Sequence, residues 1–258
     1  MQPKISIVTV CYNAVKIIEE TILSVINQTY TNIEYIIIDG GSKDGTVDII
    51  KKYNDKIAYW TSESDNGIYD AMNKGIKKAT GEWINFMNAG DSFCNLNVLA
   101  ELNRNGAFDN YDLIYGDVIG KYKIGNRLQK AGSLKDITKT MQFSHQSTFV
   151  KSSLMKEKLY ALTYRLAADY NFILSLYLSG GIFKYIPIPI AIISAEEGAT
   201  FSNFTKSKKE VRKIHLQNGY SYIRSSYYYY YYIVRSNTSS FLKKIIPGKI
   251  LKKMLKVK

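Results

Sequence analysis

Continuous apolar runs alternate with amphipathic segments through the first third of the chain. Runs typical of strands that are buried on both faces lie at Ile5–Val10, Ile33–Ile38, Ile57–Thr61 and Trp83–Met87. Apolar residues recur at helical spacing between them, which predicts helices at Val15–Ile26, Thr46–Tyr53 and about Tyr69–Ala79. This alternation predicts a doubly wound α/β unit, in which helices cover both faces of a mostly parallel sheet.

Beyond Asp91 the pattern changes, and we expect a smaller, mixed second sheet. Its strands are predicted at Asp112–Tyr122 and Leu128–Ala131. Helices are predicted near Leu96–Asn103, Ser152–Lys158, Asp169–Leu178 and Lys206–Gln217. The segment Tyr185–Ile193 contains two prolines, which lack a ladder donor, and we therefore interpret it as an edge strand or an extended segment.

Length and charge divide the chain into a main domain and an appendage. The 258 residues are 46% hydrophobic, which is ample for a sizeable core. The net charge of +13 lies entirely in the tail, because residues 1–205 hold 21 bases and 21 acids, whereas residues 206–258 hold 14 bases and one acid. We therefore predict one domain over residues 1–205, with halves at 1–93 and 94–205, and a basic, Tyr-rich helical tail at 206–258.

This charge distribution favours a catalytic unit tethered to an anionic partner over a nucleic-acid-binding protein, whose surface would be basic throughout. Cys11 and Cys94 form no metal-binding spacing, and we interpret them as two ordinary buried thiols. The chain has no recognisable leader and no apolar run near the ~20 residues of a membrane span. We expect it to work in the cytoplasm.

Ligands of doubly wound sheets bind beyond the carboxyl ends of the strands, and polar residues follow three of the predicted strands. They are Tyr12-Asn13, Asp39 and the stretch Asn88 to Asp91. The segment after Asp39, Gly40-Gly41-Ser42-Lys43-Asp44-Gly45-Thr46, is neither a Rossmann fingerprint nor a P-loop. Taken alone, it has the composition of an ordinary turn with helix-capping residues.

Three stretches taken together are more specific: SIVTVCYN, QTYTNIEYIIIDGGSKDGT and SDNGIYDAMNKGIKKATGEWINFMNAGD. In this order they resemble the nucleotide-sugar-binding half of a family 2 glycosyltransferase of the GT-A fold, in its bacterial exopolysaccharide and O-antigen branch. The resemblance covers about Pro3 to Phe93 and continues more weakly to about Glu197. It implies a Rossmann-like, mostly parallel sheet, with the nucleotide diphosphate sugar lying across the strand ends.

The resemblance also implies a Mg²⁺ or Mn²⁺ ion, bound through a D-x-D motif, that stabilises the leaving diphosphate. This chain has Asn88 and Gly90 at the two motif positions, so the metal is assigned to the following acid, Asp91. One carboxylate suffices for Mg²⁺ when substrate oxygens and water complete its shell. The alternative for Asp91 is an acid that caps a turn.

The remaining donor contacts are also implied by the resemblance. Tyr12 is expected to stack near the nucleobase, Thr9 and Asp39 to bind the base or ribose, and Asp65 to face the same pocket. Asn73 is expected to face the donor together with Asp70, or else to form a local polar pair with it. Many relatives have a second acid where this chain has Gly40.

Inversion at an anomeric carbon requires a base that takes the proton of the acceptor hydroxyl. The segment YRLAADY resembles the place where the family carries this acid, which assigns the role to Asp169. A helix N-terminus would keep that carboxylate ionised, although an ordinary helix cap has the same appearance. His145, in FSHQSTFV, resembles a histidine of this branch and is assigned to the acceptor side, with a structural role as the alternative.

Lysines and apolar residues are interleaved from Lys243 to Lys258, which predicts an amphipathic helix interrupted at Pro247-Gly248. Such a segment suits the surface of an anionic membrane, and the six consecutive tyrosines at Tyr227–Tyr232 suit its interface. The alternative is a solvated or packed terminal helix. Membrane binding would place the protein peripherally at the inner face of the plasma membrane and would indicate a lipid-linked saccharide acceptor.

The sequence thus favours an inverting, metal-dependent glycosyltransferase that acts on a nucleotide diphosphate sugar and a saccharide acceptor. A catalytically inactive nucleotide-sugar or glycan-binding protein of the same fold is the alternative, because fold does not prove activity. Nucleic-acid binding is a distant third and is not expected.

Overall fold

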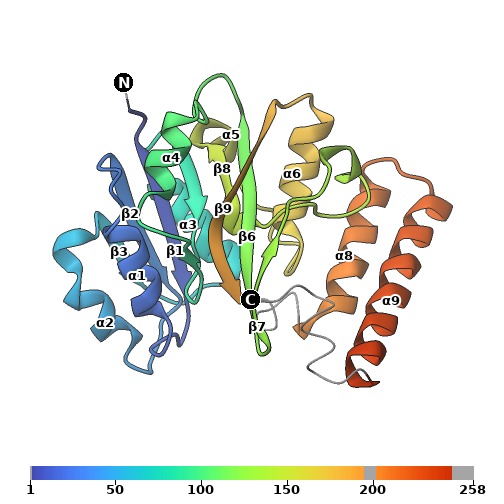
Figure 1. Ribbon diagram of the computed structural model, residues 1–258, viewed down its shortest axis with the longest axis horizontal. Coiled ribbons are helices and arrows are strands. Elements are labelled where there is room, and N and C mark those ends of the chain that lie inside the picture. Colours follow the sequence, from blue (N-terminus) through green and yellow to red (C-terminus); the bar gives the residue numbers. More distant parts are fainter. Residues whose placement is uncertain (1, 195–201, 246–258) are drawn as a thin grey trace.

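A computed structural model describes residues 2–194 and 202–245, the last nine of them by their backbone only. Its described strands form one nine-stranded sheet in the order β3-β2-β1-β4-β8-β6-β9-β5, with β7 paired to β6 (Figure 1). The strands are β1 Ile5–Cys11, β2 Ile33–Asp39, β3 Tyr59–Ser62, β4 Trp83–Phe86, β5 Ser92–Phe93, β6 Leu113–Tyr122, β7 Gly125–Gln129, β8 Thr148–Lys151 and β9 Phe183–Ser194.

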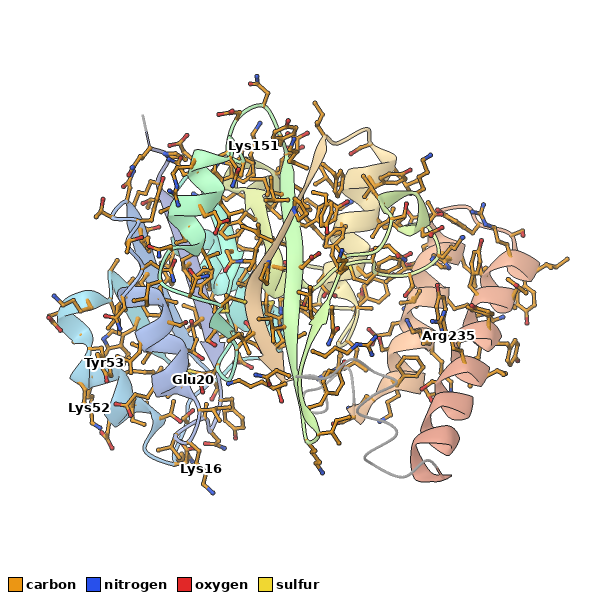
Figure 2. The ribbon with its side chains drawn as sticks, viewed as in Figure 1. Lys16, Glu20, Lys52, Tyr53, Lys151 and Arg235 are labelled. Carbon is orange, nitrogen blue, oxygen red and sulfur yellow. The ribbon has the colours of Figure 1, made fainter. Side chains whose placement is uncertain are left out.

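Helices cover both faces of this sheet, as the sequence predicts. They are α1 Ile18–Ile26, α2 Thr46–Lys52, α3 Ile68–Lys78, α4 Val98–Arg104, α5 Ser152–Glu157, α6 Ala168–Leu178, α8 Phe204–Gln217 and α9 Tyr222–Ile245. Short 3₁₀ turns lie at η1 Asn54–Lys56, η2 Leu134–Asp136 and η3 His145–Ser147. Side chains fill the layers between helices and sheet (Figure 2).

The first four strands, β1 to β4, are parallel to one another and have a core on each face. Ile5 and Ile7 of β1 belong to the core beneath α1, α2 and α4, whereas Val8 and Val10 belong to the core beneath α3 and α6. Because successive strand residues point to opposite faces, a strand buried on both sides is expected to be apolar at most positions. This requirement explains the continuous apolar runs of the sequence.

The second half joins the same sheet and does not form a separate one. Strand β8, which the sequence pattern did not predict, pairs antiparallel with both β4 and β6 and connects the two halves. Strand β9 pairs with β6 on one side and with the two-residue β5 on the other, so the prediction of an edge strand is wrong. The prolines are accommodated because the β6–β9 register shifts on both sides of Asp117, which faces Pro189.

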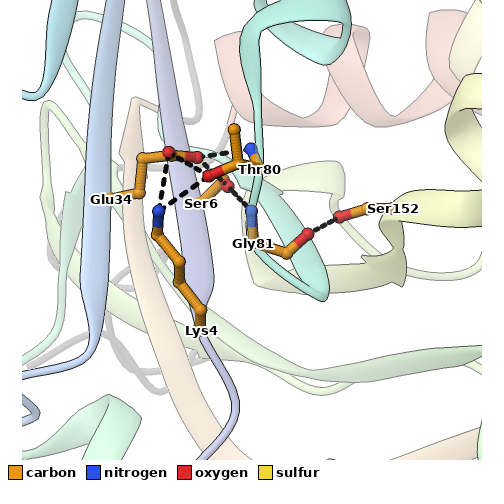
Figure 3. A network of polar contacts seen from close by, with 6 residues as sticks. All are labelled: Lys4, Ser6, Glu34, Thr80, Gly81 and Ser152. Carbon is orange, nitrogen blue, oxygen red and sulfur yellow. Dashed lines mark hydrogen bonds and ion pairs between the residues drawn. The ribbon is translucent and has the colours of Figure 1, made fainter.

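A network of polar groups fastens the amino ends of the strands (Figure 3). The carboxylate of Glu34, at the start of β2, accepts hydrogen bonds from the Ser6 hydroxyl at 2.6 Å and from the Thr80 backbone at 2.6 Å. It also pairs with the Lys4 ammonium at 2.9 Å. Burial raises the pKa of Glu34, but the bonds from Ser6, Thr80 and Lys4 outweigh it and hold the pKa at about 2.

Helices α8 and α9 run antiparallel beside the second half of the sheet, and α9 ends at the same end of the molecule as the carboxyl ends of β1 and β4 (Figure 1). Val211 and Ile214 of α8 lie in the core beneath α6, so α8 is continuous with the main body. No helix within the described residues is both long enough and apolar enough to cross a bilayer. Most of the predicted amphipathic segment, residues 246–258, lies outside the described residues.

Candidate functional site

Two loops at the carboxyl ends of β1 and β2 are tied to each other by hydrogen bonds. The amides of Asn13, Ala14 and Val15 donate to side-chain oxygens of Ser42, Thr46 and Asp44 at 2.7, 2.8 and 3.0 Å. Asn13 adopts a positive φ of 48°, and this bend delays the start of α1 to Ile18, three residues after the predicted start. Taken alone, the sequence of the loop after β2 indicated an ordinary turn. In the structure this loop also holds the loop after β1 in position at the strand-end surface.

Asp39 lies beneath these loops and is completely buried. Its carboxylate accepts hydrogen bonds from the amides of Gly41 and Ser42 at 3.1 and 2.9 Å, and from the Ser62 hydroxyl at 2.6 Å. Burial raises its pKa, but the bonds from Ser42 and Ser62 outweigh that effect, and the net pKa is lowered. The carboxylate oxygens of Asp39 therefore accept hydrogen bonds that hold the loop in shape. The predicted contact of Asp39 with the base or ribose would have to use these same oxygens.

Tyr12, Gly40 and Asp65 meet at the outer edge of the same surface. Tyr12 is 67% exposed, so its ring is available to a flat ligand. A Cβ atom at Gly40 would lie 2.6 Å from Asp65 Oδ2 and 3.4 Å from Tyr12 Cδ2. The carboxylate of Asp65 thus occupies the space that a side chain at position 40 would need. This packing gives a physical reason for the absence of a second acid after Asp39.

Two of the predicted donor contacts are engaged inside the protein. Thr9 is completely buried, donates to the Met87 carbonyl at 2.7 Å and lies 3.0 Å from the Tyr35 hydroxyl. The amide of Asn73 both donates to and accepts from the backbone of Tyr160, at 2.9 Å in each case. The structure therefore places Thr9 and Asn73 in internal packing, and neither joins the strand-end cluster.

The central cluster lies where β4, α3, α6 and η3 converge. Asp169, in the first turn of α6, accepts a hydrogen bond on Oδ1 from the Tyr69 hydroxyl of α3 at 2.8 Å. Its Oδ2 lies 3.5 Å from Nδ1 of His145. The other ring nitrogen of His145 lies 2.9 Å from the side-chain nitrogen of Asn88, which follows β4. These contacts connect residues 69, 88, 145 and 169 into one chain of polar groups.

Asp91 is linked to the same cluster through Gln146. The Gln146 side-chain amide donates to Asp91 Oδ2 at 2.7 Å, and Gln146 directly follows His145 in η3. The short η3 turn therefore carries one residue that contacts Asp91 and another that contacts Asp169. The three residues that the sequence assigned to metal, acceptor and catalysis are brought together by this turn.

The two carboxylates differ in their electrostatic surroundings. Burial raises the pKa of Asp91, and the Gln146 bond and the nearby His145 compensate only in part. Burial also raises the pKa of Asp169, but the hydrogen bond and charge of His145 and the Tyr69 bond outweigh it, so the net pKa is lowered. The Asp169 carboxylate is therefore ionised at neutral pH. Asp91 has a raised pKa, and a neighbouring positive charge would stabilise its ionised form.

The residues around Asp91 fit a hard divalent cation. The Asn88 side-chain oxygen is buried and has no hydrogen-bond partner in the part of the chain that the structure describes. It belongs to the same strand-end turn as the Asp91 carboxylate. Oxygen ligands of this kind suit Mg²⁺ and Mn²⁺. Within residues 2–194 and 202–245, no group of three or more His, Cys, Asp or Glu residues is arranged to hold a metal ion. The chain can thus supply part of a coordination shell, which substrate oxygens and water would complete.

Tyr69 and Gln146 were missed in the sequence as members of the site. Both lie inside stretches that carry the family resemblance, Tyr69 in GIYDAMNKG and Gln146 in FSHQSTFV. Their membership depends on contacts with Asp169 and Asp91, which lie 100 and 55 residues away along the chain. The position of Gln146 next to His145 was the feature of the sequence that could have indicated its membership of the site.

Comparison with known proteins gives the same family. The family model of glycosyl transferase family 2 matches residues 6–162. A PGL/p-HBAD biosynthesis glycosyltransferase of Mycobacterium bovis (strain BCG / Pasteur 1173P2) is 29% identical over 220 residues, covering 83% of this chain and 85% of the relative. An uncharacterized glycosyltransferase of Mycobacterium tuberculosis (strain CDC 1551 / Oshkosh) is 34% identical over 183 residues, covering 67% and 68%.

Solved structures share the fold at lower identity. S. aureus TarS 1-349 in complex with UDP-GlcNAc matches with a TM-score of 0.65 and 19% identity, covering 82% of this chain and 66% of that one. The mannosyltransferase PcManGT from Pyrobaculum calidifontis, in complex with GDP-Man and Mn²⁺, matches with a TM-score of 0.67 and 14% identity, covering 89% and 69%. The chain spans 39% of another TarS structure that it matches. These likenesses confirm the GT-A type of fold.

Proposed function

Because this chain belongs to glycosyl transferase family 2, we propose that it transfers a sugar, with inversion, from a nucleotide diphosphate sugar to a saccharide acceptor. The observation that carries the proposal is the convergence of Asp91, His145 and Asp169 on one strand-end surface. Tyr12 and Asp65 line the neighbouring part of that surface, next to the loop that follows β2. A single displacement requires a base for the acceptor hydroxyl and a group that stabilises the departing diphosphate, here an acid that would hold a metal ion.

Asp169 is the base in this mechanism. Its Oδ1 is occupied by the Tyr69 hydroxyl and the Tyr170 amide, whereas among the described residues Oδ2 has only the longer contact with His145. Oδ2 therefore accepts the proton of the acceptor hydroxyl. The acceptor oxygen forms its bond to the anomeric carbon as the bond between that carbon and the diphosphate oxygen breaks. His145 holds Asp169 in place and faces the acceptor.

The donor lies across the ends of β1, β2 and β4. Tyr12 stacks on the nucleobase, Asp65 accepts hydrogen bonds from base or ribose hydroxyls, and Asp39 keeps the intervening loop in position. Asp91, with the Asn88 oxygen in the same turn, would hold Mg²⁺ or Mn²⁺, which neutralises charge on the leaving diphosphate. The Mn²⁺ and GDP-Man in the PcManGT structure support this assignment by analogy.

The acceptor is proposed to be a lipid-linked saccharide of bacterial surface polysaccharide synthesis, used on the cytoplasmic side of the membrane. The basic C-terminal segment favours this acceptor, since 14 of the 35 Lys and Arg residues lie in residues 206–258. The proposed donor class includes more than one base and more than one sugar, because solved structures of the same fold contain UDP, UDP-GlcNAc or GDP-Man.

A nucleotide-release assay tests the proposal. Purified protein is incubated with a panel of UDP-, GDP- and dTDP-sugars, with Mn²⁺ or with EDTA, and released nucleoside diphosphate is measured. We expect Mn²⁺-dependent release from one donor class, abolished by Asp91→Asn and retained in a matched variant of an exposed acid, Asp55→Asn. Inversion is tested separately from the NMR coupling constant of the anomeric proton in the product.

The rival function is donor binding without catalysis. A protein that binds a nucleotide sugar by calorimetry but releases no nucleotide, with or without a panel of saccharide acceptors, would be such a binder. That outcome would overturn the enzymatic proposal while leaving the family assignment intact.

A further inference from the structure

Helix α9 turns a stripe of large apolar and aromatic side chains away from the body of the protein. The outward side chains Ile223, Tyr227, Tyr230 and Val234 follow the i, i+4, i+7, i+11 spacing of one helix face and are 82%, 62%, 61% and 63% exposed. We call these four residues, with the 44% exposed Tyr231, the outer face of α9. A helix that only covered a core would point this stripe inward.

The inward side of α9 combines tyrosine rings with polar groups that are incompletely satisfied. Tyr228, Tyr229 and Tyr232 face α8 there, next to Ser225. The Ser225 and Ser226 hydroxyls, like Nε of Arg212 and Nδ1 of His215 on α8, are buried in the described structure without a hydrogen-bond partner. Burial lowers the pKa of His215 to about 4, so the His215 ring is uncharged at neutral pH. The contact with α8 therefore accounts for the inward tyrosines of α9 but not for the exposed side chains of its outer face.

The shape and charge around the outer face identify the chemistry of that partner. A shallow hollow of about 520 Å³ is lined by Tyr227, Tyr230, Tyr231, Val234 and Arg235. From Val211 to the end of the sequence there are 11 Lys and Arg residues and no Asp or Glu. Tyrosine rings and cations without acids match the interface of an anionic lipid bilayer, in which the rings lie at headgroup level.

Self-association explains the same face less well. Two copies joined through α9 would bring the exposed Arg224 and Arg235 of both copies together, and the sequence of α9 contains no acid to pair with them. Nucleic acid matches the charge, but its recognition through stacked bases does not require the aliphatic side chains of Ile223 and Val234. An anionic bilayer alone matches the charge, the aromatic rings and the aliphatic groups.

We propose that the outer face of α9 docks the protein onto an anionic membrane surface, with the helix axis lying along the bilayer. The direction of α9 supports a functional use of this docking. It ends at the end of the molecule at which β1 has its carboxyl end (Figure 1), so the bilayer would lie on the same side as the strand-end surface. The docking site is independent of whether the strand-end cluster catalyses transfer.

Vesicle co-sedimentation of the full chain tests this proposal. The probe is phosphatidylcholine vesicles with or without about 40 mol% phosphatidylglycerol, at low and at high salt. We expect binding to the anionic vesicles to be at least about tenfold stronger than to neutral ones and to weaken with salt. Equal binding to both vesicle types would overturn the proposal.

Paired variants locate the docking face. Tyr227→Ser/Tyr230→Ser is expected to lower partitioning into anionic vesicles by about tenfold, because two interfacial rings are lost. The matched control is Leu162→Ser/Ile182→Ser, which changes two side chains of similar exposure, 51% and 55%, outside α9. Ile223→Ser, at the most exposed position, serves as a second variant if the double variant unfolds by circular dichroism.

Three further results would contradict the proposal that α9 docks onto a bilayer. Equal loss of partitioning in the outer-face and control variants would show that the face is not selective. A dimer in light scattering that Tyr227→Ser/Tyr230→Ser dissociates would assign the face to a second copy. Duplex DNA binding that the same variant weakens, without a change in vesicle binding, would assign it to nucleic acid.

Discussion

Two polar clusters lie at opposite ends of the same parallel strands, and they are built differently. At the amino ends, Glu34 has hydrogen-bond donors on both carboxylate oxygens, and its pKa is lowered to about 2. At the carboxyl ends, Asp91 has a raised pKa, and the side-chain oxygen of Asn88 has no partner. A satisfied cluster stabilises the fold, whereas an unsatisfied one retains capacity to bind a ligand.

The difference has a geometric origin. The Glu34 cluster is closed by the segment that leads into β4, through Thr80 and Gly81, and by Ser152 after β8 (Figure 3). The carboxyl ends instead continue into the loops that carry Tyr12 and Asp91. Parallel strands place the same kind of end at the same edge, and the open edge becomes the ligand site.

The largest expected effect is at Asp169. Asp169→Asn removes the proposed base and should lower turnover by at least about 100-fold. It should change the free energy of unfolding by about 1 kcal/mol or less, because the Asn oxygen can still accept the Tyr69 hydrogen bond. Nucleotide release and thermal unfolding measure the two quantities. A large loss of stability with near-normal turnover would place Asp169 with the structural cluster.

The reciprocal change is Glu34→Gln. It removes the charge that Lys4, Ser6 and Thr80 stabilise and should lower the free energy of unfolding by about 2 kcal/mol, with turnover of the folded protein unchanged. Because the folded-state pKa of Glu34 is depressed, its contribution is complete above its ordinary value of 4.5 and disappears as the pH falls toward about 2. Urea unfolding at pH 7 and pH 3 should therefore show the difference between wild type and variant shrinking in acid.

A smaller effect is expected at the nucleobase end. Gly40→Ala forces a Cβ atom to within 2.6 Å of the Asp65 carboxylate, so Asp65 must move and donor affinity should fall by about tenfold. Asp65→Ala removes the same contact. Calorimetry on both single variants and the double variant should give losses that do not add. Fully additive losses would mean that position 40 acts independently of Asp65.

The smallest expected effect is a change in pH dependence. Gln146→Leu removes the hydrogen bond that favours the ionised form of Asp91, so the pKa of Asp91 rises further and activity is lost at a higher pH on the acidic side. Turnover near pH 5.5 should fall about threefold more than turnover at pH 8. The control Gln129→Leu changes a similar side chain on β7 and should leave the profile unmoved. A uniform loss at all pH values would indicate a different role for Gln146.

Much of the fold was predictable because local patterns determine it. Strands β1, β2 and β4 were predicted to within about a residue, since burial on both faces demands unbroken apolar sequence. The prediction was poorer where pairing is non-local. Strand β8 has four residues and no distinctive apolar pattern. Strand β9 lies inside the sheet although it contains Pro187 and Pro189, because its register with β6 shifts near them.

The sequence by itself determined the alternation of strands and helices and the family, and it predicted that Asp91, His145 and Asp169 belong to the site. These follow from the spacing and identity of residues within short stretches. Only the tertiary structure decided that Thr9 and Asn73 face inward, that Tyr69 and Gln146 join the site, and that α9 turns its apolar face outward. The direction of a polar side chain depends on partners that are distant in sequence, and no local pattern records them.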